Sequence, residues 1–181
     1  MPSLRFTHLR RVSTARKVSL QTDDRSPHDW MNGLRSEVGK VCDVLDEFKR
    51  ESDGNGKEAA ALTADLADAL AGVVIHLDDV LASLKLPLAP FGAQTFDAMR
   101  FGAGLDADER GPRDALRVGQ RLLHGLEGVA DTGHFLDFAI RVLLALDEIA
   151  YCYRIDLGDA VVRKFNATSE KHGMPHRLEV A

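Results

Sequence analysis

The sequence predicts an all-α protein, and three observations support that fold class. Ala, Leu, Val and Asp are common, whereas aromatic residues make up only 6% of the 181 residues. Apolar residues recur at three- and four-residue spacing in long runs, which is the period of an α-helix. Breakers that contain Gly or Pro separate these runs. A chain of this length suits one domain, or two small ones that share a core.

The first long apolar run predicts a helix over residues 30–51. Its stripe consists of Leu34, Val38, Val41, Leu45 and Phe48. A Ser-Asp-Gly-Asn-Gly turn at residues 52–56 ends this helix. A second helix is expected over residues 57–84, because two prolines follow it closely. We interpret residues 30–86 as a helical hairpin.

The second half of the chain predicts a similar arrangement. Residues 87–111 contain several glycines and no long period, so we expect a connector with one short helix near residues 95–100. Pro112 suits the first turn of a third long helix, over residues 112–129. A fourth helix over residues 134–154 is apolar on nearly all sides and is expected to be the most buried. A final helix is expected over residues 157–171.

The two halves resemble each other in sequence. When the second and fourth helices are aligned, Leu-Asp-Asp-Val at residues 77–80 lies over Leu-Asp-Glu-Ile at residues 146–149, and Leu86 lies over Ile155. This repeat predicts an internal duplication, with chance similarity between amphipathic helices as the alternative. Residues 112–181 would then form a second hairpin and a C-terminal helix. The two hairpins would pack face to face as one bundle, with the fourth helix at its centre.

The charge of the chain narrows the function classes. The net charge of -5 argues against a general nucleic-acid binder. The first twenty residues are an exception, because they carry five basic residues and no acid. We expect residues 1–29 to form a basic arm that is solvated or disordered, rather than one that contacts phosphate. The most apolar segment, residues 135–150, is short and charged, so we expect no membrane span. Cys42 and Cys152 fall on apolar helical stretches and are expected to be buried free thiols, so we expect a cytoplasmic protein.

Four stretches in the two halves carry a family resemblance. They are Ser36-Glu37-Val38-Gly39-Lys40-Val41-Cys42, residues 66–78, residues 155–166, and Ser169 with Gly173, Pro175, Arg177 and Leu178. In this order they resemble the MazG-like all-α nucleoside-triphosphate pyrophosphohydrolases. The resemblance implies a MazG-like helical bundle that converts a (d)NTP into a (d)NMP and pyrophosphate, with Mg²⁺ as cofactor.

The carboxylates of that family are mostly missing here. Such proteins carry two acids three positions apart on each of two helices, which together bind Mg²⁺. This chain retains Glu37, but Lys40, Ala69 and Gly72 stand at the other three positions. The equivalent positions of the second half are Arg117, Gln120, Phe138 and Arg141. We therefore expect weak or no Mg²⁺ binding, and pyrophosphohydrolase activity that is weak or lost.

Glu37 is the candidate catalytic residue, and two sets of candidate ligands surround it. A shifted metal site would combine Glu37 with Asp65 and Asp68, which lie one helical turn before the missing acids; surface acids are the alternative. Lys164 and Asn166 match the family's Lys-x-Asn end, which the resemblance places near the nucleotide. Together with Lys40 they are the candidate nucleotide-binding residues. An exposed helix end is the alternative for the Lys-x-Asn pair.

The sequence leaves two functional hypotheses. One is a divergent MazG-like protein related to nucleotide pyrophosphohydrolases, which needs Mg²⁺ if it is active. The other is a non-catalytic helical module that binds a nucleotide or a partner protein. We expect the chain to bind a nucleotide and not to bind a membrane or a nucleic acid. The sequence leaves open whether the chain forms a homo-oligomer. The changes Lys40→Glu, Ala69→Glu and Gly72→Asp are expected to rebuild the four-acid pattern, with Gly72→Asp tolerated by its helix.

Overall fold

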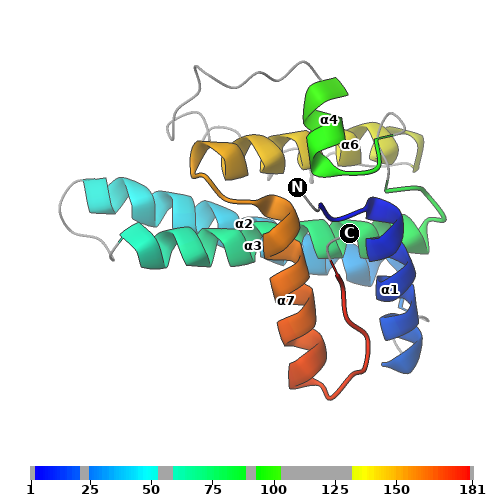
Figure 1. Ribbon diagram of the computed structural model, residues 1–181. Coiled ribbons are helices and arrows are strands. Elements are labelled where there is room, and N and C mark those ends of the chain that lie inside the picture. Colours follow the sequence, from blue (N-terminus) through cyan, green and yellow to red (C-terminus); the bar gives the residue numbers. More distant parts are fainter. Residues whose placement is uncertain (1–2, 21–24, 53–58, 89–92, 103–131, 180–181) are drawn as a thin grey trace.

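The computed structural model describes residues 3–20, 25–52, 59–88, 93–102 and 132–179, and every regular element in these ranges is an α-helix. The elements are α1 (Phe6–Ser19), α2 (Pro27–Ser52), α3 (Ala59–Ser83), α4 (Phe96–Gly102), α6 (Thr132–Cys152) and α7 (Leu157–Lys171) (Figure 1). The all-α prediction is confirmed. The helix expected over residues 112–129 lies outside the described residues.

The predicted first hairpin is formed by α2 and α3, which lie side by side along their length (Figure 1). The buried apolar residues of α2 are Trp30, Leu34, Val38, Val41 and Leu45. α2 begins earlier than expected, at Pro27, because Ser26 and Asp29 form a capping box: the Ser26 backbone and hydroxyl donate to the Asp29 carboxylate, at 3.1 and 2.7 Å. These hydrogen bonds also lower the pKa of Asp29.

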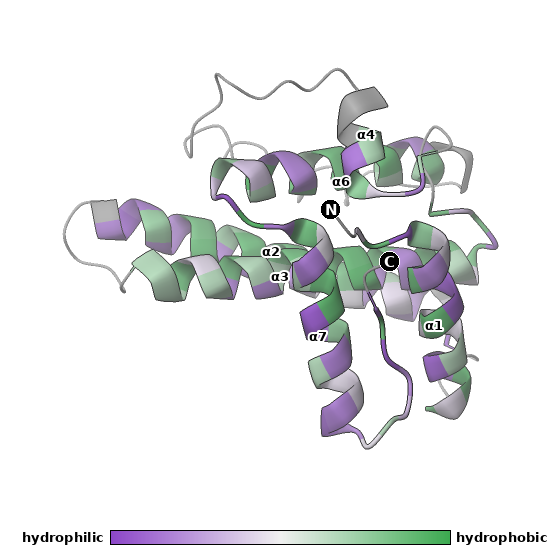
Figure 2. Ribbon diagram, in the orientation of Figure 1, coloured by the Kyte–Doolittle hydropathy of each residue, from purple (hydrophilic) through white to green (hydrophobic). Residues whose placement is uncertain are grey.

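The central helix of the described bundle is α3. It packs against α1, α2, α6 and α7, and His76 is the only residue between Ala69 and Leu81 that is not buried. Hydrophobic residues predominate where α1 and α7 cross it (Figure 2). By length and composition α3 is also the one candidate membrane span in the described residues, but 61% of its most apolar window is buried inside the bundle.

The expectation that residues 134–154 form the centre of the bundle is wrong. α6 packs against α3 and α4, and its residues Asp137, Arg141 and Tyr151 are exposed. α3 is buried along more of its length, and it carries small buried residues at Ala67, Ala69, Ala71 and Gly72. Small residues let neighbouring helices approach closely, so several helices can pack around α3.

The C-terminal turns of α3 and α6 have the same geometry. Lys85 and Arg154 have positive φ angles, 58° and 56°. The residue after each of these also has an equivalent hydrogen bond. Leu86 N–H donates to Leu81 O, and Ile155 N–H donates to Ala150 O, each at 2.8 Å. Both turns are therefore Schellman motifs formed without glycine. They fall at positions that the predicted repeat aligns.

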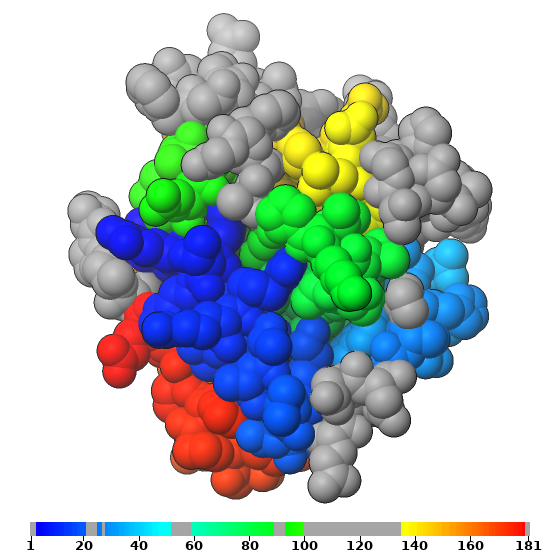
Figure 3. Space-filling model, turned by 90° about the vertical axis from the view of Figure 1, so that its right-hand side faces the viewer, coloured from blue at the N-terminus to red at the C-terminus, as the bar shows by residue number. Residues whose placement is uncertain are grey.

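The N-terminal basic segment is an ordered part of the bundle, so its description as a solvated arm is wrong. Leu4, Phe6 and Leu9 are buried, and the rings of Phe6 and Phe96 pack edge to face at 4.9 Å. These apolar anchors provide the burial that an amphipathic helix needs to dock. In Figure 3, α1 (blue) lies between the C-terminal part of the chain (red) and the part formed by α3 and α4 (green).

α7 lies across α3, and the segment after it returns along the same side of the molecule (Figure 1). Asp156 caps the start of α7 by accepting from Asp159 N–H at 2.9 Å. The side chain of Asn166 holds the returning segment: it donates to Leu178 O at 3.0 Å and accepts from Leu178 N–H at 2.8 Å. The returning segment is thus fixed against the middle of α7.

Candidate functional site

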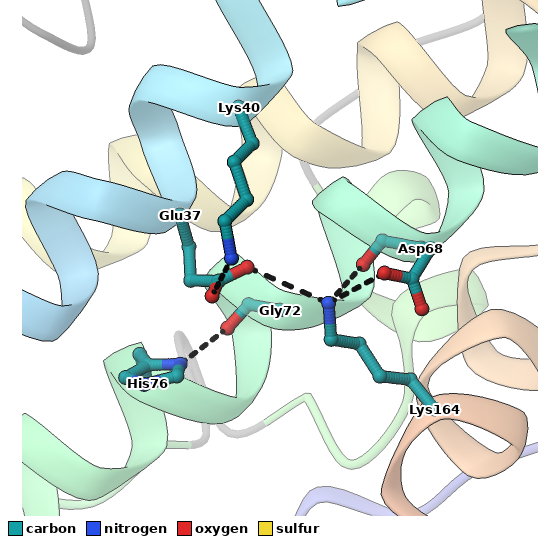
Figure 4. Close-up of polar contacts among 6 residues, drawn as sticks. All are labelled: Glu37, Lys40, Asp68, Gly72, His76 and Lys164. Carbon is teal, nitrogen blue, oxygen red and sulfur yellow. Dashed lines mark hydrogen bonds and ion pairs between the residues drawn. The ribbon is translucent and has the colours of Figure 1, made fainter. Parts of the chain in front are cut away.

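The candidate catalytic residue Glu37 lies where α2, α3 and α7 meet (Figure 4). It is 7% exposed. Lys40 Nζ donates to Glu37 Oε1 at 2.6 Å, one turn along α2. Lys164 Nζ, from α7, lies 3.5 Å from Glu37 Oε2. The carboxylate thus has an ammonium group beside each of its oxygens, which satisfies the requirement for a buried charge to be paired.

Lys164 connects this acid to a second one on α3. Its Nζ donates to Asp68 Oδ2 at 2.8 Å and to the Asp68 backbone oxygen at 2.9 Å. The ammonium therefore lies among three oxygen atoms from two helices (Figure 4). Glu37, Lys40, Asp68 and Lys164 form a cluster with two positive and two negative charges, which we call the ion cluster. Its formal net charge is zero.

Gly72 faces the ion cluster and leaves the space in which it forms. A Cβ atom at this position would overlap the Glu37 carboxylate and lie 2.9 Å from Lys164 Nζ. The expectation that Gly72→Asp is tolerated considered only helix propensity. At this position the added side chain also requires the ends of the Glu37 and Lys164 side chains to move, and it would place a third carboxylate beside Glu37.

The residues of the ion cluster do not fit Mg²⁺. Within the described ranges, no three His, Cys, Asp or Glu side chains lie together so that they could hold a metal ion. The shifted site is therefore not assembled: Asp65 is exposed on α3, while Glu37 and Asp68 both pair with Lys164. Mg²⁺ requires free oxygen ligands. Here the two carboxylates are neutralised by ammonium groups.

No protein-family model, curated protein or solved structure matches this chain. The MazG-like resemblance consequently rests on the four sequence stretches alone. Three of those stretches, far apart in the sequence, contribute the residues that meet at Glu37: the first lies on α2, the second on α3 and the third on α7.

The other candidate residues have structural roles. Asn166 was predicted to bind a nucleotide. Its side-chain amide instead forms two hydrogen bonds with the Leu178 backbone, so the amide is occupied. His76 Nδ1 forms a hydrogen bond with Gly72 O at 3.1 Å, so this histidine is satisfied within the bundle. Trp30 is 8% exposed and packs in the core, with Lys17 Nζ 5.2 Å from its ring centroid. Of the second-half positions, Phe138 is half-buried and Arg141 exposed, and Arg117 and Gln120 lie outside the described residues.

A second charged group, between α1 and α3, was not anticipated from the sequence. Arg10 Nε lies 2.5 Å from Asp78 Oδ1. Asp79 accepts from Ser13 Oγ at 2.9 Å and pairs with Lys17 Nζ at 3.1 Å. The sequence signal was present, because Arg10, Ser13 and Lys17 follow helical spacing and share one side of α1. These contacts occupy Arg10 and Lys17, two of the five basic residues that had been considered for phosphate.

Asp78 is expected to make the stability of the protein depend on pH. It is fully buried, and this burial raises its pKa to about 6 from an ordinary 3.8, although Arg10 opposes the shift. A carboxyl group with a raised folded-state pKa contributes stability below the unfolded pKa and loses it as pH rises through the folded pKa. Relative to Asp78→Asn, the natural chain should therefore lose up to about 3 kcal/mol of unfolding free energy between about pH 4 and pH 7.

Urea unfolding of both forms at several pH values measures this difference. Asp97→Asn, at an exposed acid on α4, is the matched control for the loss of one carboxylate. A difference between the natural chain and Asp78→Asn that stays constant with pH would contradict the raised pKa.

Proposed function

We propose that this chain is a divergent MazG-like protein that has lost nucleotide pyrophosphohydrolase activity and acts as a non-catalytic helical interaction module. The observation that carries the proposal is the pairing of Glu37, the one acid retained from the family pattern, with Lys40 and Lys164. An acid that is buried and paired in this way is not available to bind a metal ion or to activate water.

Common ancestry with the MazG-like family is supported by two features. The matching stretches converge on one cluster although Glu37 and Lys164 are 127 positions apart. The equivalent Schellman motifs at Lys85 and Arg154 support an internal duplication, because they occur at aligned positions of the proposed repeat. A duplicated bundle can retain its fold after the chemistry of its sites has been lost.

The charges of the cluster disfavour nucleotide binding at the same place. A triphosphate is bound by groups with uncompensated positive charge or by a metal ion. Lys164 is committed to Glu37 and Asp68, and Lys40 is committed to Glu37. Since the four charges cancel, we favour a partner protein over a nucleotide as the ligand of this module.

The natural chain is therefore expected to release no pyrophosphate from common NTPs or dNTPs above the rate without protein, in the presence of Mg²⁺ or Mn²⁺. A coupled pyrophosphate assay measures this. Glu37→Gln should behave identically. Robust release by the natural chain that disappears in Glu37→Gln would show that the site is catalytic.

Thermal unfolding with the same nucleotides separates the two non-catalytic alternatives. We expect no shift of the midpoint, whereas a nucleotide present at 100 times its Kd would stabilise the chain by about 2.7 kcal/mol. A shift that is lost in Lys164→Ala and Lys40→Ala would favour the nucleotide-binding module.

A further inference from the structure

We propose that the seam between α1 and α7, which holds the chain's own residues 174–179 in this structure, is a binding site for an extended segment of a partner protein with the sequence pattern acid-x-leucine. The seam is lined by Arg16 and Ser19 from α1 and by Asn166 and Ser169 from α7. The inference rests on the proposed function, because it names the partner of an interaction module. It goes further by giving that partner a surface and a chemistry.

Residues 174–179 lie between α7 and α1 and form neither a helix nor a strand (Figure 1). His176 Nε2 and Ser19 Oγ are 2.8 Å apart, which ties this segment to α1. Exposure alternates along the segment: residues 175, 177 and 179 are exposed, whereas His176 is half-buried and Leu178 is buried. This alternation is that of an extended chain docked by one side, so residues 176 and 178 face the seam.

Asn166 binds the backbone of the segment and not a side chain. Its amide donates to Leu178 O at 3.0 Å and accepts from Leu178 N–H at 2.8 Å. Any residue except proline offers the same two backbone groups, so this contact accepts a segment of another protein equally well. The Leu178 side chain, which is 2% exposed, supplies the selective contact. The seam therefore recognises an extended backbone with one apolar anchor.

The chain's own segment leaves two buried polar groups of the seam poorly satisfied. Ser169 Oγ is fully buried and has no hydrogen-bond partner within the described residues. Arg16 is 8% exposed; its guanidinium lies 3.6 Å from the centroid of the Phe165 ring and donates to Phe165 O at a long 3.4 Å. Burial lowers the pKa of Arg16, and the charge of Asp79 opposes this only in part. A carboxylate would satisfy both groups, because it accepts hydrogen bonds and carries the opposite charge.

The spacing places such a carboxylate two residues before the leucine. Asn166 and Ser169 share one side of α7 and lie about 4.5 Å apart along its axis. Two residues of extended chain cover about 6.6 Å, and the segment runs from Ser169 towards Asn166. In the chain's own segment this position is His176, which contacts Ser19 instead. An acid at the same position would point towards Ser169 and Arg16.

The chain's own segment is held weakly, whereas the seam does not depend on it. Leu178 is the only buried residue among residues 174–179. Few buried contacts give a low free energy of local opening. α1 is held on α3 by its own ion pairs, and the stacking of Arg16 on Phe165 joins α1 to α7 directly. A partner segment can therefore replace the chain's own one without separation of the helices.

The test is binding of a labelled peptide, measured by fluorescence anisotropy. The probe has the sequence of residues 172–179 with His176→Asp, and it is compared with the unchanged peptide and with a probe that also carries Leu178→Ser. The receptor is the full chain with Leu178→Ser, which removes the anchor of the chain's own segment. We expect the receptor to bind the probe at least about tenfold more tightly than the natural chain does, because the tethered competitor is weakened. It should prefer the probe to the unchanged peptide by at least about fivefold, and the probe without leucine should not bind.

Two substitutions in the seam separate a binding role from a structural one. Ser169→Ala, made in the Leu178→Ser receptor, should weaken probe binding about fivefold but leave the thermal midpoint unchanged or raised, because it removes a hydroxyl without a partner. Arg16→Met should abolish the preference for the His176→Asp probe over the unchanged peptide. Arg163→Ala, at an exposed residue of α7, is the matched control and should change neither result. No probe binding by the receptor, or binding that neither Ser169→Ala nor Arg16→Met alters, would overturn the proposal.

Measurements on the natural chain keep the test decisive if a variant does not fold. In hydrogen exchange, the Leu178 amide should exchange at least about tenfold faster than the Phe165 amide of α7, because the segment opens while the helices stay packed. Equal protection of the two amides would overturn the proposal. A dimer of the natural chain that is lost in Leu178→Ser would assign the seam to a second copy and would also overturn it. Pyrophosphate release by the natural chain would refute the proposed function alone, because peptide binding is measured without nucleotide.

Discussion

Replacing Arg10 with Met is expected to lower the unfolding free energy by about 3–5 kcal/mol near pH 7.5. The change removes the partner of Asp78, which is fully buried and lies 2.5 Å from Arg10 Nε. A buried carboxylate without its counter-charge loses most of the interaction that offset its desolvation. Met keeps much of the aliphatic volume of Arg, so the loss reports the polar contacts of Arg10, namely the Asp78 pair and the hydrogen bond from Nη1 to Leu86 O at 2.8 Å, rather than the packing.

Chemical denaturation measures this effect, and Arg11→Met is the matched control. Arg11 neighbours Arg10 on α1 but is exposed, so its replacement should change the unfolding free energy by no more than about 0.5 kcal/mol. The cost of Arg10→Met should shrink near pH 5, because Asp78 then takes up a proton and no longer needs a counter-charge. Equal effects of the two substitutions would contradict a buried Arg10–Asp78 pair.

Leu77→Ala is expected to cost about 2–5 kcal/mol. Leu77 is 0% exposed on α3, which packs against α1, α2, α6 and α7. Truncation there removes apolar contacts and leaves a cavity that a helix fixed by several neighbours cannot readily close. The expected loss of unfolding free energy is given as a range because it depends on how far the surrounding helices relax into the cavity.

The control for Leu77→Ala is Val18→Ala on the outer side of α1. Val18 is 58% exposed, so its truncation should stay within about 0.5 kcal/mol. Both variants are compared by urea unfolding with the natural chain, with the slope of the transition checked for two-state behaviour. A loss below about 1 kcal/mol in Leu77→Ala would show that α3 is not the centre of the bundle.

Helix positions were predictable because the apolar period of α3 and α7 and the breakers around them are local signals. The boundaries differ where side chains of the loop take part. The beginning of α2 at Pro27 depends on Ser26 and Asp29, a capping box that precedes the apolar stripe. The docking of α1 was missed because burial of Phe6 and Leu9 depends on residues far along the chain.

The sequence predicted which residues form the candidate site, but it did not predict which of them pair with each other. Glu37, Lys40, Asp68 and Lys164 were all singled out from the sequence, and they do lie together. Their pairing depends on how α7 crosses α3, which no local pattern specifies. The same limit applies to Asn166, which was expected near a nucleotide and instead binds Leu178.

The most direct test is a crystal grown with Mn²⁺, with diffraction data recorded at a wavelength where Mn²⁺ has a strong anomalous signal. The data decide whether the ion cluster stands in place of a metal site. We predict that Lys164 Nζ lies between Glu37 and Asp68, as in Figure 4, with no anomalous peak within coordination distance of either carboxylate. A peak bound by Glu37, with Lys164 turned away from Asp68, would contradict the pairing of Lys164 with both acids and restore the case for a metal-dependent hydrolase.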